Sequence, residues 1–225
     1  MPEFYLLRHG QTLFNLEEKV QGYNDSPLTA TGILQARQAG FGARQIRFAA
    51  AFSGTAQRQF DTARLFLSQN LHPIAIKKDF HFCEGCFGKY ENGTYYDMLN
   101  PLYEDLKEDY AAYDGLYRFY NDMQIAARLE EKDETGGFEG GEKTFLRFFE
   151  GLELIAEEYE EGKILVSTSS FAICTLLAHL FPDLNQSRLV NHASLTIIGK
   201  KKDRYRLISY NDTSFLKEGK EKMKE

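Results

Sequence analysis

Residues 162–173 read GKILVSTSSFAI, and this segment is the clearest indication of the fold class. Its apolar run, residues 164–166, predicts a buried strand that stops at four hydroxyl residues, 167–170. The apolar stretch FAICTLLAHL follows at once and predicts a buried helix. A buried strand that runs directly into a helix is typical of a parallel sheet covered by helices.

Strands and helices alternate along most of the chain. Short apolar runs predict strands at residues 3–8, 48–54, 74–80 and 163–167, and two closing strands at 193–201 and 204–211, joined through Lys201, Lys202 and Asp203. Helical spacing of apolar residues predicts helices within 26–44, 56–70, 142–162 and 170–181. We therefore expect an α/β three-layer sandwich with a mostly parallel sheet and helices on both faces.

Residues 81–141 differ from the rest because they are rich in Tyr, Glu and Asp and predict two or three amphipathic helices. We interpret about 95–135 as a helical insertion over the active-site end of the core, where lids and specificity elements are common. The chain is then a single domain, residues 1–217, followed by a charged tail, 218–225, which we expect to be disordered.

Composition excludes several classes of function. The formal net charge of -6 argues against nucleic-acid binding, because phosphate backbones attract basic surfaces. Three cysteines at irregular spacing do not suggest a disulfide framework. The N-terminus does not resemble a signal peptide, and the apolar stretches are too short to span a bilayer. We expect a cytoplasmic protein with no membrane partner, and the oligomeric state stays open.

Polar residues follow two of the predicted strands. The first strand ends at Arg8, with His9 and Gly10 directly after it, and Thr168 directly follows the strand at 163–167. In open α/β sheets, ligands bind outside the carboxyl ends of the strands. An Arg can grip a phosphate and a neutral His can act as a nucleophile, although an isolated Arg-His-Gly more often means a capping His and a surface Arg.

Further motifs favour a functional role for Arg8 and His9 over a capping His and a surface Arg. RHGQTLFN (8–15) and QGYNDSPLTATGILQAR (21–37) together resemble the N-terminal signature of the histidine phosphatase superfamily, in its phosphoglycerate mutase-like branch. SGTAQRQFDTA (53–63) is similar to the next block of that family, and FCEGCFGKYEN (82–92) is similar to the block with its general acid. The resemblance implies a phosphohistidine reaction that needs no metal and no cofactor.

The resemblance also assigns roles to residues. His9 is the implied nucleophile and Glu84 the implied general acid. The residues expected to contact phosphate or substrate are Arg8, Asn15, Gln21, Gly22, Arg58, Thr168 and Ser169. The expected ligand is a small phosphorylated molecule or inorganic phosphate, and a phosphatase is favoured over a mutase because further mutase residues are not found.

One position departs from the family pattern. ILVSTSSFAICTLLAHL aligns with an apolar strand, S-H-G-G and an apolar helix, so Thr168 replaces the second active-site His and Ser169 a glycine. A hydroxyl carries no positive charge, which leaves two hypotheses: a slow phosphatase, or a pseudophosphatase that binds a phosphorylated ligand or partner. We expect Thr168 to share a pocket with His9, where the N-terminus of the following helix offers N–H groups to an anion, and Thr168→His, with Ser169→Gly for room, to raise turnover.

Two alternatives concern other histidines. His192 could partly replace the missing imidazole, although a surface position is favoured for it. His81, Cys83 and Cys86 have the spacing of metal ligands, but a structural zinc needs four ligands. The third cysteine, Cys174, falls within an apolar helix, so no metal site is expected.

Overall fold

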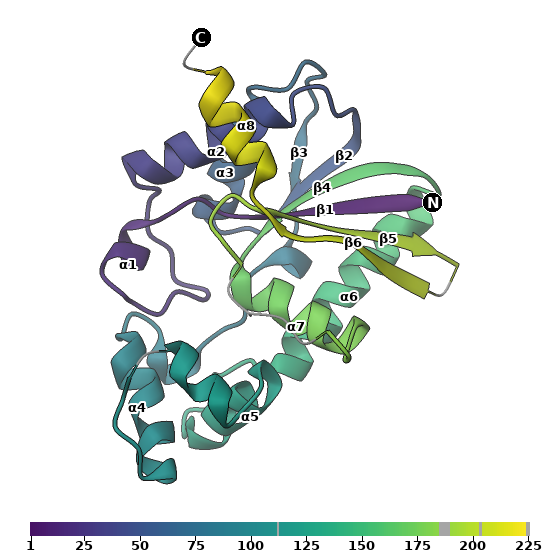
Figure 1. Ribbon diagram of the computed structural model, residues 1–225. Helices are drawn as coiled ribbons and strands as arrows, with labels where there is room; N and C mark the ends of the chain where they lie inside the picture. The colour runs from purple at the N-terminus through teal and green to yellow at the C-terminus, as the bar shows by residue number, and fades with distance from the viewer. Residues whose placement is uncertain (112, 185–189, 203, 224–225) are drawn as a thin grey trace.

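The computed structural model describes residues 1–111, 113–184, 190–202 and 204–223. Its centre is a six-stranded sheet in the order β3-β2-β4-β1-β5-β6 (Figure 1). The strands are β1 (Pro2–Arg8), β2 (Phe48–Ser53), β3 (Ile76–Lys78), β4 (Gly162–Thr168), β5 (Leu195–Lys201) and β6 (Arg204–Asp212). β1, β2, β3 and β4 run parallel, whereas β5 and β6 are antiparallel to their neighbours. The expected mostly parallel sheet is confirmed.

Helices cover both faces of this sheet (Figure 1). One face carries α2 (Ala30–Gly42), α3 (Gln57–Leu67) and α8 (Ser214–Lys222), and the other carries α6 (Gly141–Glu158) and α7 (Ser170–Leu180). Each face has its own apolar core, because alternate residues of the buried strands point to opposite sides. The three-layer sandwich follows from that alternation.

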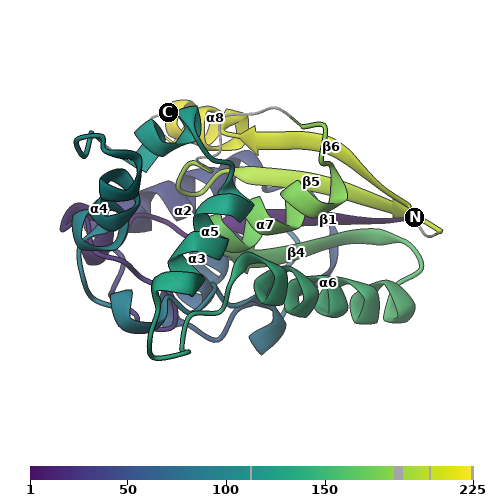
Figure 2. The ribbon, with the colours of Figure 1, turned by 90° about the horizontal axis from the view of Figure 1, so that it is seen from below.

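The insertion forms a third apolar cluster beside the carboxyl ends of the strands (Figure 2). It contains α4 (Tyr95–Leu106), the 3₁₀ helix η3 (Tyr113–Arg118) and α5 (Asp122–Lys132). Two short 3₁₀ helices, η1 (Phe80–Phe82) and η2 (Gly88–Tyr90), lead into it, and α1 (Leu13–Leu16) follows β1. The insertion therefore lies where the sequence places it, although Ala112 is outside the described residues.

Two expectations about elements were wrong. The strand expected at 74–80 covers only Ile76–Lys78. The tail expected to be disordered continues helix α8 as far as Lys222, and α8 packs closely along α2. Gly219 makes this packing possible, since a Cβ there would lie 1.8 Å from the carbonyl oxygen of Gln38. The remaining tail residues 224–225, and Asp203 of the strand connection, are outside the described residues.

No helix in the described part of the chain is both long enough and apolar enough to cross a membrane.

Candidate active site

A cavity of about 260 Å³ lies at the carboxyl end of β1, with the insertion along its other side. Five of the nine residues expected to be catalytic or to contact phosphate or substrate line it: Arg8, His9, Asn15, Gln21 and Glu84. Four others, Gly22, Arg58, Thr168 and Ser169, are not part of its lining. The cavity therefore brings together part of the expected set, and the other four residues lie outside its lining.

His9 is held in one tautomer at the end of β1. Its ring nitrogen Nδ1 lies 2.8 Å from the carbonyl oxygen of Gly10, and its backbone N–H donates to the Thr168 carbonyl over 3.0 Å. A carbonyl oxygen can only accept, so Nδ1 carries the proton and Nε2 keeps its lone pair. Gly10 is required because a Cβ there would lie 2.5 Å from the Gly32 carbonyl oxygen.

The surroundings of His9 keep its ring neutral. Burial lowers the pKa of His9 well below its ordinary value, and the charges of Arg58 and Arg8 lower it further. The Nε–H groups of both arginines are buried without an acceptor among the described residues. Because a buried unpaired donor is costly, these two groups fit an anionic ligand beside His9.

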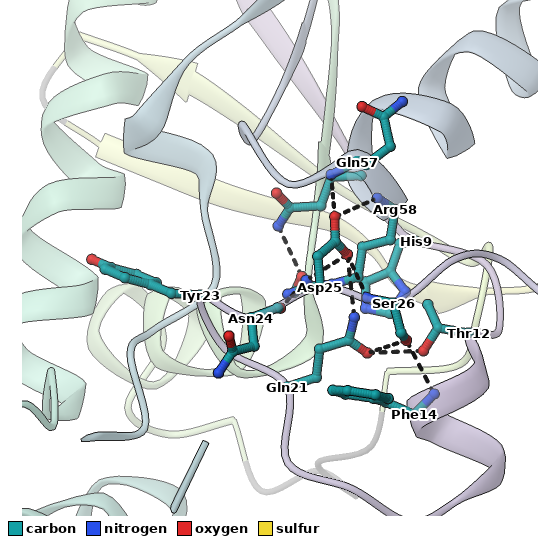
Figure 3. A network of polar contacts seen from close by, with 12 residues as sticks. His9, Thr12, Phe14, Gln21, Tyr23, Asn24, Asp25, Ser26, Gln57 and Arg58 are labelled. Atoms are coloured by element: carbon teal, nitrogen blue, oxygen red, sulfur yellow. Dashed lines mark hydrogen bonds and ion pairs between the residues drawn. The ribbon is translucent and has the colours of Figure 1, made fainter. Parts of the chain in front are cut away.

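A polar network fixes Arg58 behind the cavity (Figure 3). Its Nη1 donates to the Asn24 carbonyl over 2.8 Å and pairs with Asp25 at 3.1 Å, and its Nη2 donates to the Gly22 carbonyl over 2.8 Å. Asp25 also accepts from the backbone N–H groups of Gln57 and Arg58. Gly22 is thus a backbone acceptor that positions Arg58, and Arg58, which is 1% exposed, presents only its Nε side for other partners.

On another side of the cavity, a side chain of α1 is hydrogen-bonded to one in the segment before β5. Asn15 completes the capping box of Thr12, and its Oδ1 also accepts from His192 Nε2 over 3.0 Å. Gln21 accepts from the Thr12 hydroxyl and donates to Asp25 over 3.3 Å. His192 lines the cavity with its ring centroid 6.1 Å from that of His9, so the favoured surface position was wrong.

His192 does not supply the missing charge. Burial lowers its pKa to about 3, and Arg8 contributes to this shift, so the imidazole is neutral at neutral pH. Its Nε2–H is already given to Asn15, which leaves Nδ1 as an acceptor. His192 thus shapes the cavity without replacing an imidazolium.

The lowered pKa of His192 predicts acid sensitivity of the fold. The His192 ring takes up a proton near pH 6.5 in the unfolded chain but only near pH 3 in the folded chain. The contribution of His192 to the free energy of unfolding is therefore fully present above pH 6.5 and is lost as the pH falls toward 3. We expect His192→Gln to remove about 2 kcal/mol of the difference in unfolding free energy between pH 8 and pH 5. Urea unfolding at pH 8 and pH 5 measures this difference, and His72→Gln is the control. If His192→Gln leaves the difference unchanged, the lowered pKa of His192 is contradicted.

Glu84 sits at the N-terminus of α7. Its carboxylate accepts from the backbone N–H groups of Ala172 over 2.7 Å, Phe171 over 3.1 Å and Gly85 over 3.1 Å. The expectation that these helix N–H groups serve an external anion was therefore wrong for Phe171 and Ala172. Burial raises the pKa of Glu84, although Arg58 and the three donors oppose that shift. A buried carboxyl with a raised pKa suits a general acid.

Three side chains hold the segment that carries Glu84. The Thr168 hydroxyl donates to the Phe82 carbonyl over 2.8 Å, and Gln59 Nε2 donates to the same oxygen over 3.4 Å. From the other side, Arg147 of α6 donates to four backbone carbonyls, those of Phe80, His81, Cys83 and Glu84. The backbone before Glu84 is thereby fixed relative to β4 and α6.

Thr168 itself does not face the cavity. It is fully buried with its hydroxyl bound to Phe82, so the expected shared pocket with His9 was wrong for this side chain. Ser169 is also buried and accepts from Gln59 over 2.9 Å. Of the hydroxyl residues 167–170, Ser170 is the one that lines the cavity. The hydrogen bond from the Thr168 hydroxyl to the Phe82 carbonyl therefore makes Thr168 a positioning residue for the Glu84 segment.

We expect Thr168→Val to lower the free energy of unfolding by about 1–2 kcal/mol, because the Phe82 carbonyl keeps only its long bond to Gln59. Turnover should fall several-fold while vanadate affinity stays the same. Thr168→Ser, which keeps the hydroxyl, should behave as wild type. Vanadate binding that weakens in Thr168→Val alone would instead mean that this hydroxyl contacts the phosphoryl group.

Sequence reasoning missed several lining residues. Tyr95, Met98, Ile125 and Leu129 reach the cavity from α4 and α5. Their helical spacing is a signal for burial, but nothing in it says what they face. Among the described residues, no group of three or more His, Cys, Asp or Glu side chains could hold a metal ion. In particular, Cys83 contacts Thr55.

A model of the histidine phosphatase superfamily (branch 1) matches residues 4–213. The chain belongs to this family. As a histidine phosphatase superfamily member it is 30% identical, over 214 residues, to the uncharacterized phosphatase PhoE of Bacillus subtilis, covering 94% of this chain and 95% of that one.

Solved structures of the superfamily share the fold. The crystal structure of phosphoglycerate mutase from Bacillus anthracis is 26% identical, with a TM-score of 0.88 over 97% of this chain and 96% of that one. Bacillus stearothermophilus YhfR is 23% identical, with a TM-score of 0.76 over 96% of this chain and 100% of that one, and shows the fold alone. Phosphatases and mutases both occur among these histidine phosphatase relatives, so membership by itself does not choose between them.

Proposed function

We propose that this protein is a phosphomonoesterase that hydrolyses a small phosphorylated metabolite through a phosphohistidine at His9, without a metal ion. The observation that carries the proposal is the state of His9: a neutral ring with its Nδ1 proton fixed by Gly10, beside two arginines whose Nε–H groups have no acceptor. Two arginines offset the charge of a phosphate dianion and orient it for in-line attack.

The reaction has two steps. His9 Nε2 attacks phosphorus, the bond to the ester oxygen breaks, and Glu84 gives its proton to that oxygen. Water then attacks the phosphohistidine, Glu84 takes a proton from the water, and inorganic phosphate leaves. Burial raises the pKa of Glu84, which suits its use as an acid in the first step and as a base in the second.

The rate is expected to be low. Thr168 offers no charge, and its hydroxyl is engaged with Phe82. Loss of one preorganised donor from a transition-state site costs about a hundred- to a thousandfold in rate. The same observation favours the second candidate, a pseudophosphatase that binds a phosphorylated ligand or partner in the cavity without turning it over.

Hydrolysis of 4-nitrophenyl phosphate by purified protein, with and without EDTA, separates the candidates. Slow turnover that survives EDTA supports the phosphatase. Absence of turnover together with saturable vanadate binding supports the pseudophosphatase. Turnover that EDTA abolishes contradicts the metal-independent reaction.

A further inference from the structure

One short loop, residues 22–24, lies between two charged side chains. On one side, two of its carbonyl oxygens, those of Gly22 and Asn24, accept from Arg58 over 2.8 Å each. On the other side, all three of its backbone N–H groups donate to the carboxylate of Glu91, over 3.2, 2.9 and 3.2 Å in chain order. The loop therefore joins a buried cation to an anion through its own peptide groups.

Glu91 also fastens this loop to the segment that carries Glu84. The fourth hydrogen bond of the Glu91 carboxylate comes from the backbone N–H of Phe87, over 3.0 Å. The approach is close because residue 22 is glycine: a Cβ there would lie 2.2 Å from Glu91 Oε1 and 2.3 Å from the Gly85 carbonyl oxygen. Glu91 itself is not part of the cavity lining, so it reaches the site only through the groups that it holds.

Arg58 depends on this loop for part of its support. Its side chain is fully buried, and its Nε–H has no acceptor among the described residues. The peptide group between Gly22 and Tyr23 makes both kinds of bond, since its C=O accepts from Arg58 and its N–H donates to Glu91. Hydrogen bonds to a charged group are stronger than neutral ones, and bonds in a chain polarise one another. The charge of Glu91 therefore strengthens the hold of the loop on the guanidinium group.

We propose that Glu91 is a positioning residue for the phosphate site: it holds loop 22–24 against Arg58, and so keeps the Arg58 Nε–H aimed at a phosphoryl group beside His9. Glu91 acts through Arg58 and does not touch the substrate. Its role rests on the proposed phosphatase function of the site and extends that function to a residue outside the cavity.

Replacement of Glu91 is expected to leave the fold intact. Backbone hydrogen bonds join the same two segments: the N–H of Val20 donates to the Gly93 carbonyl over 2.8 Å, and the N–H of Asn92 donates to the Val20 carbonyl over 3.2 Å. These bonds do not involve the carboxylate. Glu91→Gln should therefore fold, and its effect on the site can be measured.

The first test is Glu91→Gln. A glutamine side chain has one accepting oxygen and an NH2 group that only donates, so two of the four N–H groups lose their acceptor. We expect the Kd of orthovanadate, measured by calorimetry, to rise about tenfold or more, and turnover of 4-nitrophenyl phosphate to fall by up to about a hundredfold, because a displacement of about 1 Å can cost that much. Unchanged vanadate affinity would overturn the proposal.

A matched control separates this role from a general loosening of the region. Asp133 is also a carboxylate that accepts from backbone N–H groups, those of Lys89 over 3.3 Å and Phe138 over 2.7 Å, and neither belongs to loop 22–24. Asp133→Asn should lower the urea midpoint but leave vanadate affinity at the wild-type value. Equal losses of vanadate affinity in Asp133→Asn and Glu91→Gln would contradict a specific role for Glu91.

A double-mutant cycle tests whether Glu91 acts through Arg58. Arg58→Lys keeps a positive charge beside Asp25, but an ammonium group lacks the fork with which Arg58 donates to both loop carbonyls. In this background, Glu91→Gln should weaken vanadate binding by less than about twofold further, because coupled residues are not additive. A further loss as large as that in the wild-type background would mean that Glu91 acts by another route.

Vanadate binding requires no turnover, which keeps the role of Glu91 separate from catalysis. If wild type binds vanadate but hydrolyses no ester, the phosphatase function fails, and weaker vanadate binding by Glu91→Gln still supports its positioning role. If wild type turns over 4-nitrophenyl phosphate and Glu91→Gln matches it in both turnover and vanadate affinity, the role of Glu91 fails and the phosphatase function stands.

Discussion

Replacement of His9 by Ala is expected to lower hydrolysis of 4-nitrophenyl phosphate by about a thousandfold or more, because His9 is the proposed acceptor of the phosphoryl group in the first step. The second imidazole of the cavity, His192, gives its Nε2–H to Asn15 and stands 6.1 Å from His9 between ring centroids. It is therefore not placed to take over attack. Steady-state kinetics at saturating substrate measure the loss.

Direct detection of the intermediate sharpens this test. Rapid acid-free quenching of wild type should trap a phosphoenzyme that is stable in alkali and labile in acid, with the phosphoryl group on His9 by mass spectrometry. His9→Ala should show none, while its urea midpoint shows that it folds. Wild-type turnover retained in His9→Ala would refute the phosphohistidine reaction, whatever the substrate.

Glu84→Gln is expected to have the second largest effect, and its size should depend on the leaving group. Loss of a general acid costs about a hundred- to ten-thousandfold when the leaving group needs a proton. We therefore expect a loss in this range for hexyl phosphate, and a much smaller one for 4-nitrophenyl phosphate, whose leaving group is stable as an anion. Comparing kcat for the two esters in both proteins measures the difference.

The pH profile gives an independent readout of Glu84. The acid must be protonated to act, so wild-type turnover of hexyl phosphate should fall as the pH rises through the raised pKa of Glu84. Glu84→Gln should lose this alkaline limb. Glu142→Gln, at the surface where Glu142 pairs with His179, is the control and should keep the wild-type profile. Equal losses for both esters in Glu84→Gln would mean that Glu84 only supports the structure of α7.

Local sequence patterns predicted most of the sheet and its covering helices. Apolar runs such as residues 164–166 are buried in the core of the sheet, as their pattern predicts. His9 comes directly after β1, so predicting that strand also predicted the position of His9 at its end. The motif around Arg58 likewise placed that residue beside His9, whose pKa it lowers. The helix at the C-terminus was not predicted, because its charged residues outnumber the few that pack against α2.

Local patterns and motifs along the chain were therefore enough to predict the α/β sandwich, the strand end that carries His9, and membership of the histidine phosphatase superfamily. The partners of the other polar groups became known only from the packed structure: Thr168 donates to Phe82, His192 lines the cavity, and Glu84 accepts from the N-terminus of α7. Each of these contacts joins residues more than 80 positions apart or faces a cavity built from several elements. Periodicity along the chain reports whether a side chain is buried, but the partner of a buried polar group is chosen by the packing of distant segments.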